Sequence, residues 1–248
     1  MTMASTILLL MIAMAPIFAP PQADPIAQVD ALFASRDSND NLNRAASLME
    51  QLTARDPSNY EAWWRLARLR YYLADRQSDQ SKKSKLLQAG VEAAKKAVAI
   101  EDKRVEGHFW YAANEGEYAD LKGVLQSLGL VKTIRKEFEA ALAINPAYEN
   151  GAIYSALGQI DLNLPRLLGG NDRRGLERLE EGLKVGQDNA ELKVSLAEAY
   201  QKKGRMDEAK RLLESVLSTN DPARSPRELE ELRAKARELL AKMKQHRL

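Results

Sequence analysis

The chain has 248 residues, of which 45% are apolar and only 6% aromatic, and its 37 Lys and Arg are balanced by 35 Asp and Glu. The recurring Ala, Leu, Glu, Lys and Arg favour helices over sheets, and the interspersed charges, net +2, exclude the basic footprint of a nucleic-acid-binding protein. Because the chain lacks cysteine, disulfides and thiol catalysis are excluded as well.

The N-terminus carries an apolar run from Ile7 to Phe18, followed by small residues from Ala19 to Ala23. A run of this length is too short to span a bilayer but suits the hydrophobic region of a secretory signal. We therefore expect residues 1–23 to be a signal peptide, cleaved near residues 19–24, and the mature protein to be periplasmic. Since no Lys or Arg precedes Arg36, an uncleaved membrane anchor is the alternative. Residues 24–40 are interpreted as a linker or N-terminal segment.

Residues 41–222 contain a degenerate internal repeat. Asp56-Pro57 is followed by a stretch with Trp63 and Leu66 at the core positions of the first helix of a tetratricopeptide (TPR) unit. The clearest single unit runs from Ala190 to Pro222, with Gly204 at the turn between its two helices. The spacing predicts an all-α protein of about four antiparallel helix pairs, stacked as a superhelix.

Two segments interrupt this repeat, and a helix ends it. Asp75–Lys85 is interpreted as a polar insertion between helices, and Leu162–Asp172 as a connection broken by Pro and Gly. Residues 223–248 are predicted to be a C-terminal capping helix with a polar outer face, because its acidic and basic residues alternate.

The motifs of hydrolases, metalloproteases and nucleotide-binding enzymes are absent from the sequence, so we expect no enzyme, no cofactor and no metal site. His108 stands without a second histidine nearby, which favours a packed helix residue over a metal ligand. The loop Gly169–Arg174 is the one candidate for anion binding, against the simpler interpretation of a tight turn with an Asn or Asp N-cap.

In TPR stacks the first helix of each pair lines a concave face. The register above places an aromatic and apolar groove there, which we predict to bind a ligand or partner through Trp64, Arg68, Tyr71, Tyr72, Phe109 and Ile153. The alternative for Trp64 and Phe109 is that both rings belong to the core, since aromatic residues at helical spacing are more often core.

The segments Asn145–Gly158, Leu164–Asp172 and Gly175–Leu183 resemble the T-component proteins of tripartite ATP-independent periplasmic (TRAP) transporters. The resemblance implies an exported, non-enzymatic TPR subunit that associates with a periplasmic solute-binding protein, forms homo-oligomers and offers a cleft to a small hydrophobic molecule. Lipid anchoring is not carried over, because there is no cysteine to acylate.

Two other functions compete with this interpretation. One is a general envelope scaffold that mediates protein–protein interaction with no transport link. The other is an enzyme with an unrecognised helical active site, which the missing catalytic motifs disfavour.

Overall fold

The computed structural model describes residues 24–245, so the expected signal peptide, residues 1–23, lies outside the described residues. Within the described range the chain is all helical. The α-helices are α1 (Pro25–Ala34), α2 (Asn39–Arg55), α3 (Tyr60–Asp75), α4 (Gln80–Ile100), α5 (Val105–Lys122), α6 (Val124–Ile144), α7 (Ala152–Asn163), α8 (Asp172–Val185), α9 (Ala190–Lys202), α10 (Met206–Val216) and α11 (Pro226–Gln245), with two 3-10 helices, η1 (Tyr148–Gly151) and η2 (Arg166–Leu168).

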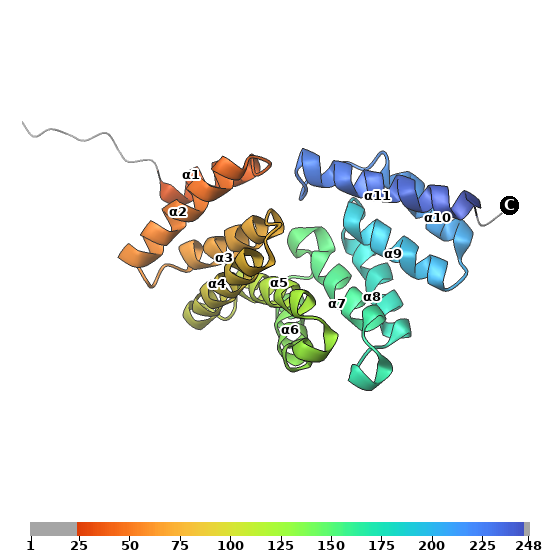
Figure 1. Ribbon diagram of the computed structural model, residues 1–248, viewed down its shortest axis with the longest axis horizontal. Helices are drawn as coiled ribbons and strands as arrows, with labels where there is room; N and C mark the ends of the chain where they lie inside the picture. The colour runs from red at the N-terminus through yellow and green to blue at the C-terminus, as the bar shows by residue number, and fades with distance from the viewer. Residues whose placement is uncertain (1–23, 246–248) are drawn as a thin grey trace, which may run out of the picture.

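The helices form antiparallel pairs that follow one another along an arc (Figure 1), which confirms the prediction of stacked TPR-like hairpins. Several helices begin where an Asn, Asp or Ser side chain accepts a hydrogen bond from the first turn, as Asn59 does for α3 and Asn189 for α9. In Figure 1 the α1–α2 turn and the start of α11 face each other, so that the two ends of the arc approach.

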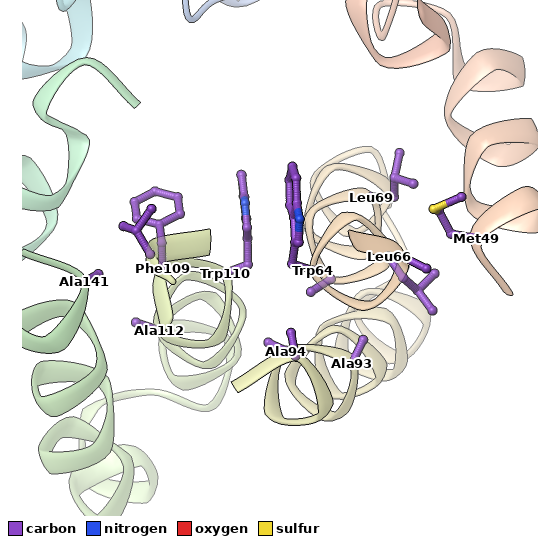
Figure 2. Close-up of a cluster of buried hydrophobic side chains, with 14 of the residues drawn as sticks. Met49, Trp64, Leu66, Leu69, Ala93, Ala94, Phe109, Trp110, Ala112 and Ala141 are labelled. Atoms are coloured by element: carbon purple, nitrogen blue, oxygen red, sulfur yellow. The ribbon is translucent and has the colours of Figure 1, made fainter. Parts of the chain in front are cut away.

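The core consists of leucines and aromatic rings packed against small residues. Figure 2 shows Met49 of α2 beside Leu66 and Leu69 of α3, with alanines where α4 and α5 pass nearby. Alanine lets the helix axes approach closely, and each hairpin buries its apolar face only against its neighbours. The buried apolar residues form two clusters along the arc, one contributed by α1 to α7 and the other by α8 to α11.

Residues 24–40 differ from the expected linker, because they contain α1. Val29 of this helix is fully buried in the main core, and Asp24 caps its first turn. The stretch Asp75–Lys85 is likewise no insertion: α4 begins at Gln80, capped by Asp79. Polar composition misled the second interpretation, since an exposed first helical turn and a loop have similar composition.

Helix α11 occupies most of the range expected for the capping helix and buries Leu229 and Ala236. Among the helices in residues 24–245, none combines the length and apolar character needed to cross a membrane.

Candidate binding site

A cavity of about 370 Å³ lies where the α5–α6 hairpin meets α7. Its lining follows α5 from Phe109 to Asp120 and α7 from Ala152 to Asn163. The apolar part of the wall is formed by Phe109, Ala113, Val131, Ile134, Phe138, Ala156 and Ile160. Exposed residues, among them Asp120 and Asn163, lie at one end, which therefore opens to solvent. The volume is in the range of a small-molecule site or of a pocket for partner side chains.

The opposite end of the cavity is aromatic and charged. Tyr71 and Tyr72 of α3 lie against Trp110 of α5, with ring centroids 5.6 and 6.0 Å from the indole. Glu149, Glu191 and Arg224 complete this end. Burial raises the pKa of the Tyr72 hydroxyl to about 12 and that of Tyr71 well above its usual value. Both phenols are therefore neutral donors at physiological pH.

Glu149 reaches the cavity from a strained turn. Glu149 and Asn150 adopt the left-handed conformation with φ of 48° and 56°, which non-glycine residues rarely do. The turn is held from outside, because the Asn189 amide donates to the Asn150 carbonyl at 2.9 Å and the Asn150 amide donates to Asp221 at 3.3 Å. Such strain persists only where the surroundings enforce it, and it is frequent at functional sites.

The Glu149 carboxyl has a raised pKa, mainly because it is buried, although the nearby guanidinium groups of Arg68, Arg224 and Arg36 oppose the shift. Among the described residues, it makes no hydrogen bond and no ion pair. Arg224, in contrast, pairs with Glu191 and lies 4.0 Å from Asp221. Burial would lower the pKa of Arg224, but Glu191, Tyr72 and Asp221 raise it.

The contacts between the α1–α2 turn and α11, which close the arc, lie beside this end of the cavity. Arg36, from the α1–α2 turn, stacks on Tyr72 at 5.4 Å and forms a two-bond ion pair with Glu228 of α11. The neighbouring Asp37 accepts a hydrogen bond from the Ser225 hydroxyl at 2.5 Å. Polar contacts therefore join the first and last helices of the stack next to the aromatic end.

The structure brings together three of the six predicted groove residues, Tyr71, Tyr72 and Phe109, at the cavity. Ile153 is fully buried in the core. Trp64 and Arg68 are also buried, with the Arg68 guanidinium 4.8 Å from the Trp64 ring and paired with Asp30 at 3.1 Å. The prediction of a groove position is wrong for these three residues.

The alternative that Trp64 is a core residue holds instead. Trp64 is 6% exposed, whereas Trp63, which we predicted to be core, is only partly buried and donates its indole N–H to the Pro57 carbonyl. The capped start at Tyr60 explains the difference, since Tyr60, Trp64 and Ala67 share one helical face and that face is buried. Phe109 is both core and cavity wall.

Glu149, Glu191 and Arg224 were missed by the sequence reasoning. None of them belongs to a helical apolar stripe, and they meet only because η1, the start of α9 and the turn before α11 fold together. The sole sequence signal was the Asn145–Gly151 break before α7, where Gly151 has φ of 80°.

The other candidate sites have ordinary structural roles. His108 is buried, with Nδ1 2.6 Å from Glu137 and Nε2 2.7 Å from the Asp102 carbonyl oxygen. In the loop before α8, Asn171 caps the helix, and Arg174 donates to the buried Asp161. Residues 24–245 contain no group of three or more side chains suited to hold a metal ion.

Two solved structures have folds similar to that of this chain. A thermophilic TPR protein of Thermus thermophilus has a TM-score of 0.63 at 21% identity, covering 86% of this chain and 96% of the other. PilF of Pseudomonas aeruginosa has a TM-score of 0.55 at 14% identity, covering 88% of each chain. At these identities the likeness shows the fold alone.

Sequence comparison matches two parts of the chain to two protein families. Residues 173–236 match the tetratricopeptide repeat, and residues 25–159 match the family described as regulator of microtubule dynamics protein 1-3. Regulator of microtubule dynamics protein 1 of Bos taurus is 27% identical over 123 residues, 49% of this chain and 37% of the relative. The protein of the same name from Pongo abelii is 28% identical over 48% of this chain and 39% of the relative. The match thus spans well under half of either relative. Since the family match covers more than half of the present sequence, the chain is a TPR protein that belongs to the regulator of microtubule dynamics protein 1-3 family.

Proposed function

We propose that this protein is a non-enzymatic scaffold that binds a segment of a partner protein in the cavity between α5, α6 and α7. The observation that carries the proposal is the cavity itself, which combines apolar walls, an open end and unpaired polar groups at the opposite end. A pocket of this kind in a helical repeat is the usual place for a partner to bind.

The family supports a protein partner. The family name, regulator of microtubule dynamics, describes proteins that act on a protein polymer. Residues 25–159, the matched part, contain most of the cavity wall. We propose that the matched part supplies the interaction module, and we transfer to this chain the binding of protein and no further activity of the relatives.

Export to the periplasm stays a proposal that rests on the apolar run Ile7–Phe18. It is tested by the mass of the protein isolated from cells, which should correspond to a new N-terminus near residues 19–24. Association with a TRAP solute-binding protein, with uptake of a hydrophobic solute, rests on sequence resemblance alone. We therefore favour the scaffold without a transport link.

The scaffold is tested by site-specific crosslinking from the cavity mouth. A photoreactive residue at Asn163 should capture partners, and the same residue at the exposed Glu214 on α10 serves as the control. Ala156→Phe, which fills the cavity, should abolish capture from position 163 only. Identical capture from both positions, or capture unaffected by Ala156→Phe, would contradict the proposal.

The identity of the captured protein separates the alternatives. A periplasmic solute-binding protein would revive the TRAP association. A crosslink between two copies of this chain would identify a homo-oligomer as the occupant.

A further inference from the structure

We infer that the aromatic end of the cavity binds a positively charged group, an ammonium or guanidinium carried on an apolar body, with Glu149 as its counter-ion. The inference rests on the proposed function, whose partner segment it characterises.

The first argument is hydrogen bonding. The Tyr71 hydroxyl, the Tyr72 hydroxyl and the Glu149 carboxyl all belong to residues of the cavity wall. Among the described residues, none of the three has a hydrogen-bond partner, although hydrogen bonds of neighbouring groups such as Trp110 to Tyr148 are made. All three residues are partly exposed, so their polar atoms are accessible to a ligand. A ligand with several N–H donors would satisfy the carboxylate and one or both phenol oxygens.

The second argument is charge. Each guanidinium near Glu149 already pairs with another carboxylate, since Arg36 pairs with Glu228, Arg68 with Asp30 and Arg224 with Glu191. Asp30 is shared with Arg65. Glu149 is the carboxylate left over. Two further acidic residues, Glu117 and Asp120, line the cavity, and Lys83 pairs with Glu117 at 3.3 Å. The excess is negative, so a cation is attracted and an anion repelled.

The third argument is the ring surface. At this end the ring centroids of Tyr71, Tyr72 and Trp110 lie within 6.0 Å of one another. Tyr72 already has one cation near its ring, because the Arg36 guanidinium lies 5.4 Å from its centroid. Cations bind to aromatic faces with a strength that grows as water is excluded. The apolar body of the ligand would extend along Phe109, Ile134 and Phe138 toward the open end.

Two sources supply this chemistry. One is a Lys or Arg side chain of a partner protein, flanked by apolar residues, and the other is a free organic amine. A partner protein, as proposed above, would supply the first.

The test uses the full chain and three probes that share one apolar body, namely octylamine, octanoate and 1-octanol. Binding is followed by calorimetry and by the intrinsic tryptophan fluorescence, to which Trp110 contributes. Octylamine should bind at one site at least about tenfold more tightly than the other two. Glu149→Gln should lower octylamine affinity about tenfold or more and leave 1-octanol unchanged. Glu214→Gln, on the exposed face of α10, should change neither.

A second pair of variants guards against misfolding of the strained turn. Tyr71→Phe with Tyr72→Phe should weaken octylamine binding, whereas Tyr118→Phe, which removes a hydroxyl outside the cavity, should not. Preference for octanoate, or equal binding of all three probes, would overturn the inference.

The sources are then separated. If octylamine displaces a protein captured through Asn163, the cation is a side chain of the partner. If octylamine binds but no protein is captured, the scaffold proposal fails while the cation site stands, with an amine extracted from the purified protein as its ligand. If a protein is captured but octylamine does not bind, the scaffold stands and the cation site fails.

Discussion

Arg36 and Glu228, 192 residues apart in the chain, form an ion pair in which the Arg36 Nε and Nη2 groups donate to the two carboxylate oxygens, each at 2.9 Å. Arg36 Nη2 also donates to the Ala223 carbonyl at 2.7 Å. In a simple solenoid each repeat contacts only its neighbours. Here the first and last helices are joined, and the joint lies next to the aromatic end of the cavity.

Breaking this joint should open the arc. Arg36→Met leaves the Glu228 carboxylate largely buried without its main partner, so we expect the free energy of unfolding to fall by roughly 3 kcal/mol. The radius of gyration from small-angle scattering should increase. The control is Arg44→Met, whose exposed ion pair with Asp40 spans 3.9 Å, and here the change should stay below about 0.5 kcal/mol. An unchanged radius of gyration would show that other contacts close the arc.

Burial of the two neighbouring tryptophans predicts opposite consequences of truncation. Trp64→Ala removes a buried ring that packs against Arg65 and Arg68, so unfolding should become easier by about 3–5 kcal/mol. Trp63→Ala removes a partly exposed ring and one hydrogen bond, and should cost clearly less. Urea denaturation measures both. Equal losses would mean that the two rings are buried alike in solution.

Helical spacing, turn glycines and N-caps predict the stacked hairpins, because those signals are local. The cavity is not local. Tyr71 and Tyr72 are found from the repeat register, but Glu149 and Arg224 reach the site from turns whose positions depend on how the whole arc closes. The sequence pattern assigns the buried position to Trp63 instead of Trp64, because a shift of one residue rotates the buried face of a helix by about 100°.

Close contact between α7 and α8 depends on two glycines. A Cβ on Gly158 would lie 2.8 Å from Leu179 and 3.1 Å from the Gly175 carbonyl oxygen. Gly158→Ala should therefore force the helices apart and destabilise the protein by about 1–3 kcal/mol. Gly129 in α6 is the matched control, since its Cβ would meet nothing within 4 Å, and Gly129→Ala should stabilise by about 0.5–1 kcal/mol. Thermal and urea unfolding would test the sign, and a stabilising Gly158→Ala would refute the close contact.

His108 and Glu137 provide a prediction on pH. Both ring nitrogens of the buried His108 face acceptors, the Glu137 carboxylate and the Asp102 carbonyl, an arrangement that suits the protonated ring. The hydrogen bond to Glu137 is the main cause that raises the pKa of His108, against the effect of burial. Burial would raise the pKa of Glu137, but its bonds to His108 and Lys136 lower it.

The two shifts define a window of stability. The raised pKa of His108 contributes stability below its unfolded value of about 6.5, which is lost as the pH rises through the folded value. The lowered pKa of Glu137 contributes above its unfolded value of about 4.3, and that part is lost as the pH falls through the folded value. The variant His246→Gln leaves His108 as the single remaining histidine. In this background, His108→Gln should lower the free energy of unfolding most between about pH 4.5 and 6.5, by on the order of 1.5–3 kcal/mol, and less at higher pH. Unfolding free energies measured from about pH 4.5 to 9 test this, with an NMR titration of the ring as an independent reading. A cost that does not vary with pH would show that His108 is neutral in the folded protein.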